Sequence, residues 1–213
     1  QDVVRPISNP IYPQGGIAVL RGNLAPGGAI IKQSAADAKL MEHEGRAVVF
    51  NNAADLALRI DSEDLEVMPD DVLVLKNIGP KGAPGMPEAG YLPIPIKLAR
   101  AGVKDMVRIS DGRMSGTAYG TIVLHVTPES AIGGPLAYVQ TGDRIRLSVS
   151  NREISLLVSE EELTRRQRNM PVAHPVADRG YHKLFLQTVN QADQGADFDF
   201  LRASEAKGKT PRV

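Results

Sequence analysis

The sequence predicts a mixed α/β fold built around a strand-rich β-barrel, mixed or antiparallel, with several short helices packed outside it. The 213 residues include 20 glycines and 15 prolines but few aromatic residues, a composition typical of a chain with many turns. Short β-branched runs lie between these turns, which favours strands. Predicted strands outnumber predicted helices, so a doubly wound sheet is disfavoured.

Nine segments are predicted to be strands, because each is a short apolar or β-branched run that ends at turn residues. They are 17–21, 29–33, 46–50, 72–77, 106–109, 121–126, 136–140, 144–149 and 153–158. Apolar and polar residues alternate over 144–149, which indicates a β-hairpin with one buried face in the region 136–158.

Four short helices are predicted. Asn52 can cap the first and Ser159 the third, and Pro95 can stand only in the first turn of the second. An apolar periodicity of about 3.6 residues defines the fourth. The helices are 53–60, 96–101, 159–169 and 180–191.

Three parts of the chain are expected. Residues 1–16 are rich in proline and glycine and contain neither an initiator Met nor a signal-peptide pattern, so we interpret them as a linker from a missing amino-terminal domain. The alternative is a complete small protein with a processed amino terminus. Residues 17–169 form the barrel domain, and 170–213 form a carboxyl-terminal helix and tail packing on the barrel.

Charge and cysteine content exclude several classes of function. The 25 basic and 25 acidic residues give a formal net charge of zero, which argues against a general nucleic-acid or anionic-membrane binder. No apolar run approaches the ~18 residues of a membrane span. The absence of cysteine excludes disulfides, thiolate zinc sites and an iron–sulfur cluster held by this segment itself.

Two glycine-containing loops are the candidate functional segments. The first, 79–88 (GPKGAPGMPE), follows the strand 72–77 and delivers Glu88; the second, 110–117 (SDGRMSGT), follows the strand 106–109. Both leave the carboxyl ends of apolar strands, where open sheets often bind ligands. A tight structural turn is an equally good interpretation of each loop from composition alone.

A hydrolase triad has little support in this sequence. No histidine lies near Ser115, and no Gly-x-Ser-x-Gly elbow is present. If Ser115 reacts, its hydroxyl must be made more acidic by a metal or cluster, a helix N-terminus or Arg113. His125 lies within a strand, where a hydrogen-bonded structural histidine is a better interpretation than a catalytic one.

At these loops the chain closely resembles the carboxyl-terminal domain of the IlvD/Edd dehydratases, over nearly all 213 residues. The matching motifs occur in the same order: 20–32 (LRGNLAPGGAIIK), 79–88, 110–117, 125–130 (HVTPES) and 133–136 (GGPL). The segments 115–120 (SGTAYG) and 191–200 (QADQGADFDF) resemble the L-arabinonate or D-xylonate type of sugar-acid dehydratase.

The resemblance implies a reaction and a set of site residues. Family members remove water from a 2,3-dihydroxy acid to give a 2-keto-3-deoxy acid. Ser115 matches the serine that takes the C2 proton, Glu88 matches a carboxylate that reaches Mg²⁺, and Thr117, with the neighbouring Gly116, is placed to bind substrate. The family also implies a barrel similar to the swivelling domain of aconitase-type enzymes.

The resemblance further implies an iron–sulfur cluster and Mg²⁺ as Lewis acids, with the cluster ligands in the missing amino-terminal domain. We therefore expect a cytoplasmic homo-oligomer, with no nucleic-acid or membrane partner, and an isolated segment that is inactive. Two alternatives stay open: a dihydroxy-acid dehydratase of branched-chain amino-acid biosynthesis, and a free-standing barrel subunit without catalysis.

Overall fold

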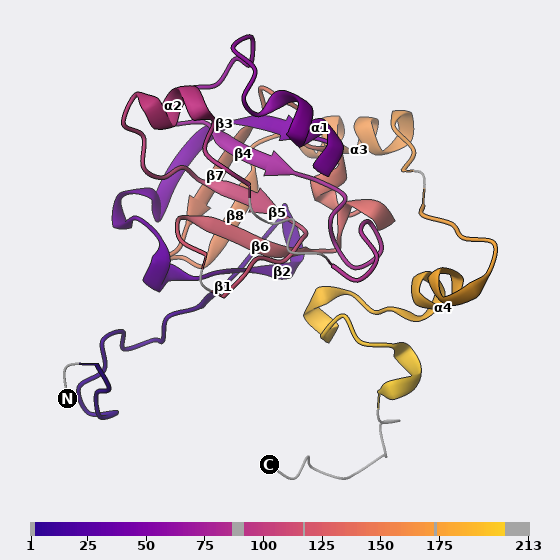
Figure 1. The fold of residues 1–213 in the computed structure, drawn as a ribbon, viewed down its shortest axis with the longest axis horizontal. Helices are drawn as coiled ribbons and strands as arrows, with labels where there is room; N and C mark the ends of the chain where they lie inside the picture. The colour runs from indigo at the N-terminus through magenta and orange to yellow at the C-terminus, as the bar shows by residue number, and fades with distance from the viewer. Residues whose placement is uncertain (1–2, 87–91, 117, 173, 203–213) are drawn as a thin grey trace.

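A closed barrel of eight strands forms the centre of the computed structural model, which describes residues 3–86, 92–116, 118–172 and 174–202 (Figure 1). Around the barrel the strands follow the order β1-β2-β6-β5-β4-β3-β7-β8. Their bounds are β1 Ala18–Gly22, β2 Ala25–Ile31, β3 Glu42–Phe50, β4 Val72–Leu75, β5 Arg108–Ser110, β6 Ile122–Thr127, β7 Arg144–Ser148 and β8 Glu153–Leu156. The prediction of a mixed α/β fold with a strand-rich barrel is confirmed.

The barrel combines parallel and antiparallel pairing. β3, β4, β5 and β6 are parallel neighbours, whereas β1–β2, β2–β6, β3–β7 and β7–β8 are antiparallel. A parallel pairing of Arg21 with Glu153 closes the barrel between β1 and β8. Because β3 to β6 run in one direction, the chain leaves all four at the same end. We call this end of the barrel the loop end.

Alternate residues of the parallel strands enter two different cores. Ala47 and Val49 of β3 face the barrel interior with Val72 and Val74 of β4. Their neighbours on the same strands face outward and form a second core with α1 and α2. The outward set from β3 and β4 is Val48, Phe50, Leu73 and Leu75. This two-sided burial explains why the segment Val72–Leu75 is apolar without alternation.

The described part of the chain has four α-helices outside the barrel: α1 Ala53–Arg59, α2 Ile96–Arg100, α3 Glu160–Asn169 and α4 Gly180–Thr188. The predicted caps are confirmed, because the side chain of Asn52 accepts a hydrogen bond from the Asp55 amide and that of Ser159 from the Glu162 amide. Within the described ranges, the helices are all too short or too polar to cross a membrane.

One predicted strand is wrong. Residues 136–140 lie mostly in a 3₁₀ helix, η4, which spans Pro135–Tyr138. Pro135 has no N–H to donate to a ladder, and side chains bind the carbonyl oxygens that a neighbouring strand would otherwise bind. Lys76 donates to Ala137 and Val139, and Arg166 of α3 donates to Tyr138. The hairpin predicted in the same region is confirmed as β7–β8.

Residues 170–172 and 174–202 form a segment that we call the C-terminal arm, drawn in orange to yellow beside the barrel in Figure 1. Four aromatic rings contact one another along the arm: Tyr181, Phe185, Phe198 and Phe200. The arm also contacts the barrel. His174 Nδ1 lies 3.1 Å from the Ala131 carbonyl oxygen, and the 3₁₀ helix η5, Ala192–Gln194, lies beside β2 and β6.

Candidate functional site

The two predicted loops leave neighbouring parallel strands at the loop end of the barrel. The first loop (79–88) follows β4 and the second (110–117) follows β5, and β4 pairs with β5. The loops also contact each other, because Arg113 Nε donates to the Met86 carbonyl oxygen at 2.7 Å. The expectation that both loops leave the carboxyl ends of apolar strands is confirmed.

Asp111 anchors the two loops and the end of β6 at one point. Its carboxylate is fully buried and accepts hydrogen bonds from the amides of Asn77, Ile78 and Ser130, at 2.8 to 3.3 Å. Burial raises the pKa of the Asp111 carboxyl above its usual range, and the three N–H donors oppose that shift by stabilising the anion.

Glu129 is a second buried carboxylate at the loop end, just after β6. It accepts hydrogen bonds from the Lys81 and Gly82 amides of the first loop, at 3.0 and 2.9 Å. Gln191 of the C-terminal arm donates to it at 2.7 Å. Burial raises the pKa of the Glu129 carboxyl. Glu129 therefore joins the first loop to both β6 and the arm.

Lys76 brings a buried positive charge to the same end of the barrel. It follows β4, is 5% exposed, and donates to the carbonyl oxygens of Ala137 and Val139 at 2.8 and 2.6 Å. Burial lowers the pKa of the Lys76 ammonium from 10.5 to about 8. Backbone groups thus hold three charged side chains where β4, β5 and β6 end.

Ser115 is half-buried in the second loop, and both flanks of its segment are fixed to the barrel. On one side the His125 amide of β6 donates to the Gly112 carbonyl oxygen at 3.1 Å. On the other, Lys32, which follows β2, donates from Nζ to the Gly116 carbonyl oxygen. The second loop is therefore tied to β6 and to the residue that follows β2. A Cβ built on Gly116, the residue after Ser115, meets no described atom within 4 Å.

The other two predicted site residues, Glu88 and Thr117, lie outside the described residues. Met86 is the last described residue of the first loop, and Gly116 precedes Thr117. Among the described residues there is no group of three or more His, Cys, Asp or Glu side chains that can hold a metal ion. These residues alone therefore do not form a metal centre.

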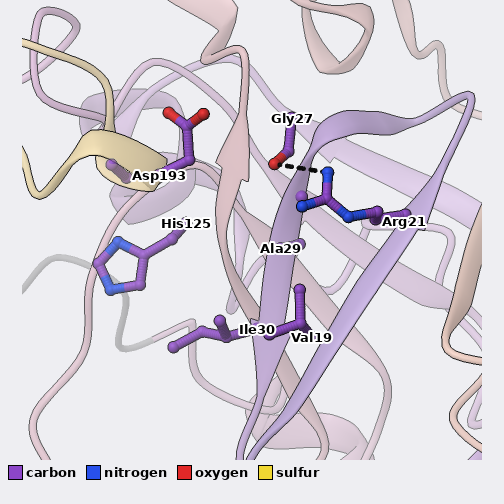
Figure 2. Close-up of a pocket in the computed structure, with 9 residues that line it drawn as sticks. Val19, Arg21, Gly27, Ala29, Ile30, His125 and Asp193 are labelled. Carbon is purple, nitrogen blue, oxygen red and sulfur yellow. Dashed lines mark hydrogen bonds between the residues drawn. The ribbon is translucent and has the colours of Figure 1, made fainter. Parts of the chain in front are cut away.

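A pocket of about 340 Å³ lies on the outer face of β1, β2 and β6, and none of its lining residues belongs to the second loop. In Figure 2, His125 and Asp193 lie on one side of it and Arg21 and Gly27 on the other. The Arg21 guanidinium donates to the Gly27 carbonyl oxygen at 3.2 Å. Asp193 belongs to η5, so the C-terminal arm forms part of the pocket wall.

His125 differs from the hydrogen-bonded histidine that the sequence predicted. Its Nδ1 is buried and has no hydrogen-bond partner among the described residues. Its φ of 54° is unusual for a residue other than glycine and interrupts the alternation of β6. Burial, and then the nearby Arg113 charge, lower the pKa of the His125 ring. The ring is therefore neutral at pH 7 and lines the pocket.

Sequence reasoning singled out Ser115 and Gly116 but missed the anchoring roles of Asp111 and Glu129. Both carboxylates stand inside motifs that had been recognised, 110–117 and 125–130. Their hydrogen-bond partners lie 19 to 62 residues away in the sequence. The available signal was an acidic residue directly after an apolar strand, which is equally typical of an exposed turn.

Comparison with known proteins identifies the family. The model of the dihydroxy-acid/6-phosphogluconate dehydratase C-terminal domain matches residues 2–196. The chain is 51% identical to the 6-deoxy-6-sulfo-D-gluconate dehydratase of Pseudomonas putida over 213 residues, which cover 99% of this chain and 37% of that protein. It is 50% identical to the L-arabinonate dehydratase of Rhizobium leguminosarum bv. trifolii (strain WSM2304) over 202 residues, covering 95% and 35%.

Dihydroxy-acid dehydratases are more distant. That of Clostridium botulinum (strain Alaska E43 / Type E3) is 40% identical over 196 residues, covering 92% of this chain and 35% of that protein. The chain thus spans about a third of the length of the curated relatives it matches. The chain belongs to the IlvD/Edd dehydratase family, as its carboxyl-terminal domain.

Proposed function

We propose that this chain supplies half of the active site of a hydro-lyase that dehydrates a 2,3-dihydroxy sugar acid, an aldonate, to a 2-keto-3-deoxy acid. The observation that carries the proposal is the position of Ser115. It lies in a loop that hydrogen bonds tie to β6 and to Lys32 on its two flanks, in a chain whose relatives include dehydratases of arabinonate and of sulfogluconate.

In the proposed reaction Ser115, as an alkoxide, takes the proton from C2 of the substrate. The C3 hydroxyl departs, and the resulting enol tautomerises to the 2-keto acid. Gly116 leaves room for the substrate next to the serine, and Thr117 is the proposed hydrogen-bond donor to it. A serine hydroxyl keeps its proton at neutral pH and is then a poor base. Its fixed position and its electrostatic surroundings must therefore activate it.

We also propose that the complete protein binds an iron–sulfur cluster and Mg²⁺, with Glu88 as the ligand that this chain gives to Mg²⁺. Such groups supply Lewis-acid stabilisation of a leaving hydroxyl and a developing enolate. The described residues do not fit a complete site for either group, and the chain has no cysteine. The remaining ligands therefore come from outside this chain, and these 213 residues alone are expected to be inactive.

A sugar acid is preferred to a branched-chain dihydroxy acid because the sugar-acid dehydratases are 50 to 51% identical to this chain, against 40% for the dihydroxy-acid dehydratase. In keeping with this family assignment, we propose a cytoplasmic homo-oligomer. A barrel subunit without catalysis is the remaining alternative, and absence of any turnover would favour it.

The deciding experiment is an anaerobic dehydration assay of the full-length gene product, loaded with cluster and Mg²⁺. Substrates are L-arabinonate, D-xylonate, D-gluconate and 2,3-dihydroxyisovalerate. We expect a 2-keto-3-deoxy acid from a sugar acid, and a decrease in kcat of about 10³-fold or more in Ser115→Ala.

The matched control is Ser150→Ala, in the exposed turn between β7 and β8, which should keep full activity. Normal turnover by Ser115→Ala contradicts the assigned base. Turnover of 2,3-dihydroxyisovalerate alone keeps the reaction and contradicts the sugar-acid substrate.

A further inference from the structure

Glu129 makes an unusual set of contacts for a carboxylate that is 1% exposed. Within the described residues its hydrogen-bond donors are two backbone amides and one side-chain amide. Lys81 contributes its N–H at 3.0 Å to both carboxylate oxygens, and Gly82 its N–H at 2.9 Å to Oε2. No basic side chain donates to Glu129 among these contacts. The anion is held by the first loop itself.

Gly79 shows how closely the loop approaches this carboxylate. A Cβ at Gly79 would lie 2.6 Å from Glu129 Oε2 and 2.9 Å from Glu129 Cβ. Real side chains do not approach so closely, so only glycine permits the contact. The first loop is therefore shaped around the Glu129 side chain.

Gln191 completes a reciprocal pair with Glu129. The Gln191 Nε2 donates to Glu129 Oε1 at 2.7 Å, and the Glu129 amide donates to Gln191 Oε1 at 2.9 Å. Gln191 directly precedes Ala192 and Asp193, which line the pocket in Figure 2. One carboxylate thus fixes both the first loop and the arm segment that walls the pocket.

We infer that Glu129 is a positioning residue for the dehydration reaction. It fixes the first loop and the C-terminal arm relative to each other at the end of β6. The inference rests on the proposed function for its catalytic part. A side chain that served stability alone would be better neutral at this depth, because burying a charge without a cationic partner is costly.

Hydrogen-bond polarity gives a decisive set of variants. In Glu129→Gln the new NH₂ group faces a donor in either orientation: the Gln191 NH₂ group on one side, or the Lys81 and Gly82 N–H groups on the other. If Gln191 flips to offer its oxygen, its own NH₂ group then faces the backbone N–H of residue 129. In Gln191→Glu two carboxylates face each other. In the double variant the new amide at 129 donates to the new carboxylate at 191, and the Lys81 and Gly82 amides keep an oxygen acceptor.

The test uses the full-length gene product with these three variants. Hydrogen exchange followed by mass spectrometry is measured on peptides covering 79–86, and kcat and KM are measured on the best sugar-acid substrate. We expect exchange over 79–86 to be about tenfold faster in each single variant and kcat/KM to fall about tenfold. The double variant should recover to within about threefold of wild type in both measurements.

Gln191→Glu keeps the test decisive if Glu129→Gln does not fold, because it leaves Glu129 and its loop donors in place. The control is Glu44→Gln, an exposed carboxylate paired with Arg144 on β7, which should change neither measurement. Wild-type exchange in the single variants overturns the inference, as does a double variant whose defect is the sum of the two singles.

The exchange data keep this inference separate from the proposed function. If no sugar acid is turned over, the proposed function fails while the exchange pattern still tests whether Glu129 positions the loop. If exchange is rescued in the double variant but kcat/KM never changes, Glu129 fixes the loop without a role in the reaction, and the inference is overturned.

Discussion

The two ends of the central strands handle buried charge in different ways. At the amino ends of β4 and β5, Asp71 pairs with Arg46 and Asp105 pairs with Arg108, each at 2.8 Å. At the carboxyl ends of the same strands, Lys76 and Asp111 are bound by backbone groups.

The difference has a physical meaning. An arginine–carboxylate pair balances its own charge, so it can be buried to fix a strand without affecting its surroundings. A charged side chain that is bound by backbone groups is not neutralised by an oppositely charged hydrogen-bond partner. Its electrostatic field therefore acts on its surroundings, and its pKa is shifted. Such charges cluster where sites are built, and here they lie beneath the loops that carry the candidate residues.

The largest expected effect of a substitution is at the arginine-paired end. In Asp105→Asn the buried Arg108 guanidinium loses its negatively charged partner, and one amide oxygen must replace the two carboxylate oxygens that accept from Arg108 at 2.8 Å and from the Thr121 hydroxyl at 2.7 Å. We expect the free energy of unfolding to fall by about 3–5 kcal/mol. Urea denaturation of wild type and variant measures it, and a loss below about 1 kcal/mol would remove the basis of the comparison.

At the loop end, the effect of burying the Lys76 ammonium on stability can be measured at alkaline pH. Its pKa of about 8 is below the ordinary 10.5, so between these values the unfolded chain binds more protons and stability rises with pH. Relative to Lys76→Met, wild type should gain up to about 3 kcal/mol between pH 8 and 10.5. A difference that stays flat over this window would show that the ammonium is not destabilised by burial.

Asp111→Asn should have a smaller effect on stability than Asp105→Asn. The variant removes a buried negative charge that accepts hydrogen bonds from three backbone amides, and its own amide cannot accept from all three N–H groups. We expect a loss of about 1–3 kcal/mol, together with a marked decrease in kcat, because both loops are anchored here. A variant as active as wild type would contradict the role of Asp111 in the site.

The smallest expected effect is an opposite pH dependence of the stability contributed by Asp111 and by Glu162 at acid pH. The pKa of Asp111 is raised by burial, so wild type should gain stability relative to Asp111→Asn as the pH falls through the folded-state pKa toward 3.8. Hydrogen bonds from Arg165 and Arg166 lower the pKa of the partly exposed Glu162 to about 2. Wild type should therefore lose stability relative to Glu162→Gln as the pH falls from 4.5 through 2. Denaturation midpoints measured across pH 2–6 give the slope of each stability difference, wild type minus variant, against pH. Slopes of equal sign would contradict the expected contrast between Asp111 and Glu162.

Local patterns predicted most of the barrel. Eight of the nine expected strands formed, because short apolar runs with turn residues on both sides have few alternatives. Asn52 and Ser159 capped their helices as expected. The ninth segment became η4 because Lys76 and Arg166, distant in sequence, bind its carbonyl oxygens.

The candidate site was only half predictable. Residues 110–117 and 79–88 could be recognised as loops with ligand-binding composition, and Ser115 within them through family resemblance. The anchoring of these loops by Asp111 and Glu129 depends on donors up to 62 residues away. No local pattern records such a contact, so the buried carboxylates were visible only as ordinary polar residues in turns.

The sequence by itself determined the family, the strand-rich class, the caps and the two loops, because each depends on neighbouring residues or on motifs read in order. Only the tertiary structure decided that the barrel closes as β1-β2-β6-β5-β4-β3-β7-β8. It also decided that the Nδ1 of His125 is buried without a partner among the described residues, and that Glu129 joins the first loop to the C-terminal arm. These features arise from contacts between distant segments, whose free energy exists only after the chain has closed on itself.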